Sequence, residues 1–294
     1  MFSIAYRMLG SVPEAEDLVQ EAYLRFHRAT AQGEIIASPK AYLSTVTTRL
    51  AIDSLRSARA RHETYVGVWL PEPLLVSTDA DPAEQAEVDD SLSLAFLVVL
   101  QTLSPVERAI FLLREVFDYG YDEIADITRK SEDNCRQIFA RAKKRIEAGR
   151  PRFTASKQEQ RELAIRFFDA ADKGNLANLV SYLAADATFY GDGGGKAQAF
   201  PQPIRGQERV ARLFAGIFVK GHELAASWQF VFVNGQPGIM TFDADGGLIS
   251  VMALDFADGL IKSVHSMVNP DKLRHLGFPL TQSVGVIKAN SGTP

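Results

Sequence analysis

The side chains best suited to chemistry gather in a segment that ends in a basic run at residues 140–145. Arg136, Gln137 and Arg141 recur at helical spacing, so a helix would present them on one face. Arginine and glutamine form paired hydrogen bonds with base edges in the major groove of DNA, and neighbouring lysines suit phosphates. We therefore predict a DNA-recognition helix, against the alternative of a helical bundle with a solvated charged face. The predicted contact residues are Ser131, Arg136, Gln137, Arg141, Lys143 and Lys144.

The residues around this helix predict the elements that position it. Ser104, Pro105 and Glu107 form a capping box with proline at the first helical position, so a helix begins there. Gly120 ends it, and a turn at 128–130 leads to a new helix cap at Ser131. The last helix has an apolar stripe opposite its charged face, made of Cys135, Ile138, Ala142 and Ile146. This order predicts a helix-turn-helix over 103–146.

The residues before the helix-turn-helix divide into a helical block and a linker. Residues 1 to about 62 carry three amphipathic helical patterns, at 2–9, from 13 onward, and from 42 to about 61. Residues 67–90 contain prolines and an acidic series that cannot bury enough apolar surface to fold alone. An apolar helix at 92–103 then leads into the helix-turn-helix.

The character of the chain changes at about residue 157. Helical patterns at 160–172, 176–183 and 206–220 accompany a short strand at 187–190. Alternating apolar patterns at 227–234, 238–243, 248–256 and 260–268 predict antiparallel strands. Asn-Gly and Asp-Gly pairs mark the turns between them. We predict an α+β domain with one curved sheet and helices on one face.

The composition limits the classes of protein to which the chain can belong. A net charge of −4 is unusual for a protein that binds DNA unaided, so either the basic surface is local or another partner supplies most of the affinity. Cys135 is the only cysteine, which excludes a disulfide within the chain and favours a reducing, cytoplasmic location. No apolar run approaches the length of a membrane span.

Two stretches of the helical block carry a resemblance to a known family. AYRMLGSVPEAEDLVQEAYLRF at 5–26 and PKAYLSTVTTRLAIDSLRS at 39–57, followed by the helix-turn-helix, resemble the extracytoplasmic-function (ECF) sigma factors of bacterial RNA polymerase. The resemblance implies two all-α sigma domains: region 2 at 1–62 for the −10 promoter element, and region 4 at 92–150 for the −35 element. A linker at 63–91 would join them. Its implied partners are the RNA polymerase core and promoter DNA. Met1 falls where the family already has helix, so we expect a few residues to precede it.

The resemblance also implies roles for particular residues. The helix-turn-helix residues named above would read the −35 element. The acidic and polar face of Asp17, Gln20 and Glu21 would dock on the polymerase core. The residues implied at the −10 element, which combine a stacking ring with phosphate-binding cations, are Ser38, Tyr42, Arg49, Arg56 and Arg59.

Three short motifs in order narrow the resemblance to the ECF41 subgroup, which adds a C-terminal SnoaL-like domain with an NTF2-like cone fold. They are WLPEP at 69–73, DGGGK at 192–196 and NPDKL at 269–273. The resemblance implies that the domain, at 157–282, acts in place of an anti-sigma factor by docking near the linker. We also expect Trp69 to contact the DGGGK loop, since its ring needs burial. The implied interdomain regulatory residues are Trp69, Leu70, Pro71, Glu72, Pro73, Asp192, Gly193, Gly194, Gly195, Lys196, Asn269, Pro270, Asp271, Lys272 and Leu273.

Two other classes of function remain open for the C-terminal domain. An enzyme would use Asp192, Asp255 and His265 beside an aromatic face, but no acid–base pair recurs at fixed spacing. We therefore predict no enzyme, catalytic residue, metal or cofactor; the aromatic face comprises Trp228, Phe230 and Phe232.

A cone-shaped domain leaves a cavity for an unidentified small ligand. A helix-turn-helix regulator that senses or transforms such a ligand is the alternative function, although it leaves the N-terminal block unexplained. We expect a monomer when the protein is free.

Overall fold

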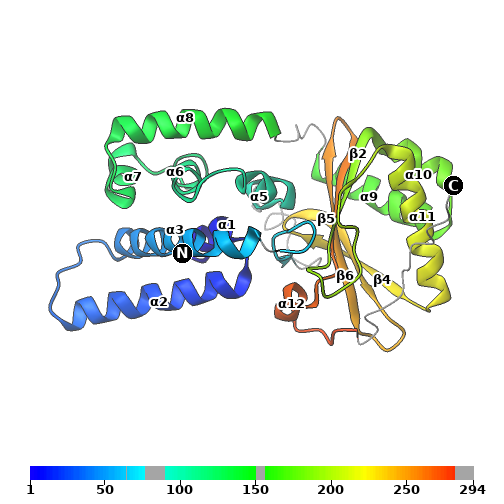
Figure 1. Cartoon of the computed structure of the whole chain (residues 1–294), viewed down its shortest axis with the longest axis horizontal. Coiled ribbons are helices and arrows are strands. Elements are labelled where there is room, and N and C mark those ends of the chain that lie inside the picture. Colours follow the sequence, from blue (N-terminus) through cyan, green and yellow to red (C-terminus); the bar gives the residue numbers. More distant parts are fainter. Residues whose placement is uncertain (64, 77–89, 150–155, 282–294) are drawn as a thin grey trace. The chain divides into compact units, whose positions relative to one another are not determined.

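The computed structural model describes residues 1–63, 65–76, 90–149 and 156–281, with side chains at 1–57, 65–75, 91–147 and 156–281 (Figure 1). The chain forms two compact units. Unit 1 contains Met1–Thr64 and Phe96–Arg150, and unit 2 contains Tyr65–Ala95 and Pro151–Pro294. Within the described ranges, no helix combines the length and the apolar character needed to cross a membrane.

The N-terminal part of unit 1 is a bundle of three helices, α1 (Phe2–Leu9), α2 (Val12–Ala31) and α3 (Pro39–Glu63), as the sequence predicts. Gly10 ends α1 in the left-handed conformation (φ 70°), which suits glycine, and the Ser11 hydroxyl caps α2 by accepting from the Glu14 amide. Small buried side chains such as Ala5, Ala22 and Ala51 allow the three helices to pack closely.

The predicted helix-turn-helix is confirmed over α6 (Pro105–Glu115), α7 (Tyr121–Thr128) and α8 (Glu132–Gly149), which follow α5 (Leu94–Leu100). The capping box between Ser104 and Glu107 is present in both directions. Arg129 ends α7 with a φ of 55°, and the Ser131 hydroxyl caps α8 by accepting from the Asn134 amide. The predicted stripe on α8 is buried, and Cys135 and Ile138 pack against apolar residues of α6 and α7.

Helix α6 also packs against α1 and α3 within unit 1. The Arg108 guanidinium is buried there and donates to the carbonyl oxygens of Met8 (2.6 Å) and Leu100 (3.0 Å). Burial lowers the pKa of Arg108 to about 10. Since α1 ends one residue after Met8, the cation interacts favourably with the negative end of that helix.

Unit 2 is an α+β domain, again as predicted. Its sheet has the strand order β1-β4-β5-β6-β7-β2-β3. All neighbouring pairs are antiparallel except β2 with β7. The strands are β1 (Leu75–Val76), β2 (Leu183–Asp192), β3 (Ile204–Arg205), β4 (Ser227–Val233), β5 (Gln236–Phe242), β6 (Leu248–Ala257) and β7 (Leu260–Met267). The helical elements are η1 (Asp90–Leu92), α9 (Lys157–Asp172), α10 (Leu176–Tyr182), α11 (Gln207–Glu223), α12 (Pro270–Leu273) and η2 (Arg274–Leu276).

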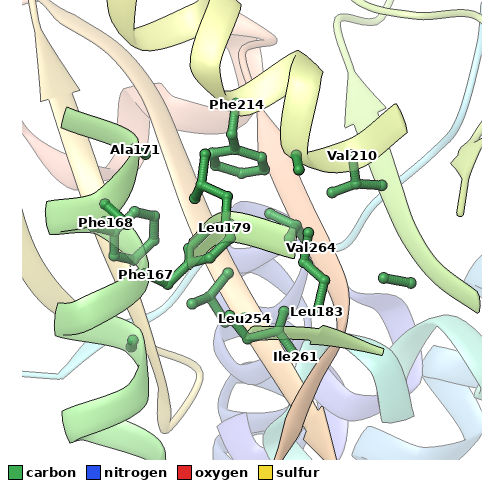
Figure 2. Close-up of a cluster of buried hydrophobic side chains, with 14 of the residues drawn as sticks. Phe167, Phe168, Ala171, Leu179, Leu183, Val210, Phe214, Leu254, Ile261 and Val264 are labelled. Atoms are coloured by element: carbon green, nitrogen blue, oxygen red, sulfur yellow. The ribbon is translucent and has the colours of Figure 1, made fainter. Parts of the chain in front are cut away.

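The core of unit 2 lies between one face of the sheet and the helices α9, α10 and α11 (Figure 2). Phe167 and Phe168 of α9 and Phe214 of α11 are fully buried there, and the Phe167 and Phe214 rings meet edge to face at 4.8 Å. Leu254 and Val264 supply the sheet side of this core. Aromatic side chains therefore fill much of the space that the sheet encloses with its helices.

Part of the predicted linker belongs to unit 2. Residues 69–73 approach the sheet, and Leu75 and Val76 form strand β1, which pairs with Val233 and Phe232 of β4. The sequence pattern does not predict this strand, because the two residues gain backbone partners only from a part of the chain more than 150 residues away.

Candidate nucleic-acid interface and linker contact

The predicted −35 contact residues lie on the exposed side of α8 and in the turn before it. Ser131, Gln137, Arg141 and Lys144 are exposed, while Lys143 is half-buried and pairs with Glu115 at 3.1 Å. Arg136 is exposed but ordered by neighbours: its guanidinium pairs with Glu132 (3.0 Å) and lies over the Tyr121 ring (4.7 Å). These residues form a polar face opposite the buried stripe, which is the arrangement that base reading requires.

The predicted −10 residues cluster around the start and the middle of α3. The Ser38 hydroxyl caps α3 by accepting from the Ala41 amide, and the half-buried Tyr42 ring meets Phe26 edge to face. Arg49 donates to the carbonyl oxygens of Asp126 (2.8 Å) and Ile127 (3.0 Å), near the carboxyl end of α7. These carbonyl oxygens lie at a helix C-terminus, where a cation is favourable. The side chain of Arg59 lies outside the described residues.

A groove of about 520 Å³ lies beside Tyr42 and Arg49, between α3 and the helix-turn-helix. Its lining carries four guanidinium groups and one carboxylate, from Asp53. Arg56 lies 3.4 Å from this carboxylate. The other lining residues are Arg25, Val46, Ile52, Val106, Ile127, Thr128 and Arg129. An excess of cations beside an aromatic ring suits a nucleic-acid strand.

The residues predicted to dock on polymerase lie along one side of α2. Asp17 and Gln20 are exposed, and Glu21 is half-buried and pairs with Arg25 at 2.7 Å. This hydrogen bond holds the pKa of Glu21 below its usual value. Leu24, one turn further on, is half exposed and adds an apolar side chain to the same side.

A buried ion pair joins two of the three motifs and holds the linker in unit 2. Lys272 of α12 and Asp192 at the end of β2 are almost fully buried, with Nζ 2.7 Å from Oδ2. The same Oδ2 accepts from the Leu70 amide at 2.8 Å, and Lys272 also donates to the Leu70 carbonyl oxygen. The Tyr65 hydroxyl donates to Asp192 Oδ1. Asp192 and Lys272 therefore bind both backbone polar groups of one linker residue, Leu70.

The aromatic residues of the linker surround the same lysine. The Lys272 ammonium lies 4.0 Å from the centre of the Trp69 ring and 5.0 Å from that of Tyr65. Pro71, Glu72 and Pro73 are buried. The ring contact of Trp69 is with Lys272 of NPDKL, whereas the expected contact of Trp69 with the DGGGK loop stays a prediction.

Two further contacts extend this linker contact. The His275 ring of η2 hydrogen-bonds to the Pro73 carbonyl oxygen at 2.7 Å, and its Nδ1 lies 3.9 Å from Glu72. Asn269 donates from Nδ2 to the Tyr65 hydroxyl, and its Oδ1 caps α12 by accepting from the Asp271 amide. The sequence motifs did not include Tyr65 or His275; a tyrosine or histidine at an unremarkable position carries no local signal of such a role.

The glycines of DGGGK allow the loop to approach these residues closely. Gly194 has a φ of 56°, and a Cβ atom there would lie 2.1 Å from Asn269 Nδ2. A Cβ atom at Gly193 would lie 2.2 Å from the carbonyl oxygen of Ala197. Gly195 follows with a positive φ, and Lys196 forms an exposed ion pair with Asp271. Pro270 is the first residue of α12, and Leu273 is buried at its end.

The electrostatics of the linker contact are those of charges removed from water. Burial lowers the pKa of Lys272, while the charge of Asp192 partly opposes that shift. Burial raises the pKa of Tyr65 well above its usual value, and the hydrogen bond to Asp192 raises it further. Each group therefore favours its uncharged form more than it would in water.

Asp255 and His265, two residues that the enzyme alternative would use, form a pair within the sheet. Asp255 and His265 are buried with Nδ1 2.8 Å from Oδ2, and Tyr190 stacks on the His265 ring. Leu254 and Val264, the neighbours of this pair along their strands, face the helix-covered core, as do Trp228 and Phe230. Side chains alternate along a strand, so the acidic and imidazole groups lie on the other face from the aromatic rings.

One residue with several contacts to the linker was missed. The sequence marks Asn234-Gly235 as a hairpin turn, and this turn is present. The Asn234 side chain is nevertheless 1% exposed and bonds to the backbones of Leu74 and Leu92. A turn signal explains the residue's backbone but does not indicate a partner for its side chain.

Comparison with known families defines the class of protein. The chain matches the families Sigma-70 region 2 over residues 1–61, Sigma-70 region 4 over 93–146 and SnoaL-like domain over 164–264. It therefore combines the two DNA-reading regions of a sigma factor with a SnoaL-like domain. The match over 1–61 covers the block that the alternative helix-turn-helix regulator left unexplained, so that alternative is not favoured.

Relatives along the whole chain define the family. The chain is 36% identical over 292 residues to the ECF RNA polymerase sigma factor SigJ of Mycobacterium tuberculosis, covering 96% of this chain and 92% of SigJ. It is 31% identical to the probable ECF sigma factor SigI of the same species, covering 93% and 91%. A crystal structure of M. tuberculosis SigJ has a TM-score of 0.75 with 33% identity, covering 93% of this chain and 94% of that one. The chain belongs to the ECF RNA polymerase sigma factors.

Proposed function

We propose that this protein directs the RNA polymerase core to promoters through α3 and α8, and that its SnoaL-like domain controls this activity by holding the linker. The observation that carries the proposal is the buried ion pair of Asp192 and Lys272, which binds both polar groups of the Leu70 backbone. A linker held in this way is not available to the polymerase. The domain then does the work of a separate anti-sigma protein.

The proposed reading of DNA follows from the two polar faces. Arg136, Gln137 and Arg141 would contact base edges at the −35 element, with Lys143 and Lys144 on phosphates. Tyr42 would stack on a base of the −10 element, with Arg49 and Arg56 on its backbone. Because the chain carries a net charge of −4, we propose that polymerase supplies much of the affinity for DNA.

The remaining parts of the proposal concern the setting of the protein. We propose that Asp17, Gln20 and Glu21 contact the polymerase core, that the protein is a monomer before it does so, and that it works in the cytoplasm. Relatives named as sigma factors support a role in binding rather than catalysis. A small ligand of the SnoaL-like domain stays a prediction.

In vitro transcription tests the proposal directly. The full chain and the Lys272→Met variant are each added to RNA polymerase core with a library of promoter fragments. We expect promoter-specific transcripts, and more of them with Lys272→Met because the linker is released. The absence of a specific transcript from both proteins and from a chain ending at residue 155 would refute the sigma assignment. Equal transcription by the two full-length proteins would refute control through the linker.

A further inference from the structure

The residues that flank the stretch 75–91 are held at the same turn of the sheet. Leu74 lies just before β1 and Leu92 lies at the end of η1, so they flank the stretch 75–91 on its two sides. Both contact the turn between β4 and β5, in which Asn234 and Gly235 have φ values of 53° and 75°. Turns of this kind are usually at the surface, yet the Asn234 side chain is buried.

Asn234 makes three hydrogen bonds to Leu74 and Leu92, which lie on the two sides of this stretch. Its Oδ1 accepts from the Leu74 backbone amide at 2.9 Å, and the backbone amide of Asn234 donates to the Leu74 carbonyl oxygen at 2.7 Å. Its Nδ2 donates to the Leu92 carbonyl oxygen at 3.0 Å. One side chain therefore bridges two backbone segments that lie 18 positions apart along the chain.

The chemistry of this position is particular to asparagine. The side chain must accept from one backbone group and donate to another, which an aspartate cannot do. It must also tolerate a positive φ, which asparagine does better than most residues with a side chain. Glycine would satisfy the backbone and lose both side-chain bonds.

We propose that Asn234 is a positioning residue that closes the linker into a loop. When Asn234 holds Leu74 and Leu92 close together, the 18 residue-to-residue steps between them cannot extend. They then add nothing to the distance that the linker can span between regions 2 and 4. Extended, these steps would span on the order of 60 Å. The −10 and −35 elements are about 25 base pairs apart, or roughly 85 Å of duplex at about 3.4 Å per pair. The closed loop therefore opposes simultaneous contact with both elements, an inference that rests on the proposed sigma function.

Hydrogen exchange tests the loop without relying on transcription. In the full chain, Asn234→Gly removes the bridge and keeps a residue suited to positive φ. Asp258→Gly is the matched control, because Asp258 occupies the corresponding turn between β6 and β7, has a φ of 52° and is exposed. We expect the Leu74–Val76 amides to exchange at least ten-fold faster in Asn234→Gly, and at the parent rate in Asp258→Gly.

A second variant and a second readout separate the bridge from a general loss of structure. Asn234→Asp keeps the acceptor for Leu74 and loses the donor to Leu92, so we expect faster exchange around Leu92 than around Leu74. With polymerase core, Asn234→Gly is expected to raise promoter-specific transcription at least three-fold over Asp258→Gly. Exchange in Asn234→Gly equal to that in Asp258→Gly would overturn the loop closure and leave the sigma function standing. Faster exchange without any specific transcript from any variant would instead refute the sigma function.

Discussion

At the scale of single residues, the linker contact depends on charges that water no longer solvates. Asp192 is fully buried and its Oδ2 accepts from both Lys272 and the Leu70 amide. Removing one member of a buried ion pair leaves the other without compensation, and this loss costs more than the pair itself contributes. The pair thus ties the stability of unit 2 to the presence of the linker.

The first prediction concerns this pair. Lys272→Met is expected to lower the free energy of unfolding by about 3–5 kcal/mol, because it leaves the buried Asp192 carboxyl group without its partner. Chemical denaturation of the full chain measures the change. Lys196→Met is the control: its pair with Asp271 is exposed, so a loss below about 1 kcal/mol is expected. If the two substitutions lower the free energy of unfolding by the same amount, burial of the Asp192–Lys272 pair does not increase its contribution to stability.

The second prediction uses the raised pKa of Tyr65. In the folded protein Tyr65 keeps its proton above pH 10, whereas the unfolded chain loses it there. The stability that this residue contributes is therefore fully present below about pH 10 and declines as the pH rises further. Lys272 acts with the opposite sign, because its pKa is lowered and its contribution rises with pH below about 10.5.

The comparison with Tyr65→Phe isolates the tyrosine, since Lys272 is present in both proteins. We expect the stability advantage of the parent over Tyr65→Phe to shrink between pH 9.5 and 11, as measured by urea unfolding at each pH. Tyr23→Phe serves as the control because the Tyr23 ring is half exposed on α2. An advantage that stays constant over this range would show that the buried hydroxyl does not hold its proton.

At the scale of elements, the face of α8 that carries Arg136 decides which bases are read. Arg136 is already oriented by Glu132 and Tyr121, so little side-chain freedom is lost when it binds. Lys144, on the same face, is exposed and suits a phosphate. The two residues should therefore affect binding in different ways.

The third prediction separates these two kinds of contact. Arg136→Ala is expected to weaken binding of the polymerase complex to the correct −35 element by about 1–3 kcal/mol and to leave altered elements nearly unaffected. Lys144→Ala should weaken binding to all DNA sequences alike, and the salt dependence of that binding should fall by about one released counterion. Binding titrations over a range of salt concentrations provide both numbers. A uniform loss with Arg136→Ala would make it a phosphate contact instead.

Local rules explain which elements were predictable from the sequence. The capping box at Ser104, the stripe that includes Cys135 and the Asn234-Gly235 turn each depend on residues within a few positions, and all three are present. Strand β1 was not predictable, because Leu75 pairs with Val233 through backbone groups that every residue has. The same holds for Arg49, whose partners are carbonyl oxygens 77 and 78 positions away.

The candidate site was predictable to the extent that motifs carry it. The three motifs meet at Asp192 and Lys272, as their shared resemblance implies, but their spacing does not indicate which side chains pair. Tyr65, Asn234 and His275 were missed because each acts on backbone or side-chain groups brought near only by the fold. The roles assigned to the DNA-facing and polymerase-facing residues remain predictions.

At the scale of the whole molecule, the end of the chain acts on a linker some 200 residues earlier. Lys272 and His275 contact the backbone of Leu70 and Pro73 across a separation of 202 positions in each case. These contacts come from α12 and η2, which follow the last strand of the sheet. The sheet itself ends at Met267, so its strands and the α9–α11 core are complete before these contacts begin.

The fourth prediction follows from this separation. A chain that ends at Val268 loses Asn269, Lys272 and His275 but keeps every strand of unit 2. The linker should therefore be released at Tyr65, Leu70 and Pro73, and promoter-specific transcription with polymerase core should rise even though Asn234 remains. A chain that ends at Thr281 keeps α12, η2 and the bridge between Leu248 and Leu280, and should transcribe like the full chain. Run-off transcription compares the three proteins, and hydrogen exchange around Leu70 reports release of the linker. If the chain ending at Val268 exchanges faster at Leu70 yet transcribes no more than the others, the contacts of α12 and η2 stabilise unit 2 without controlling initiation.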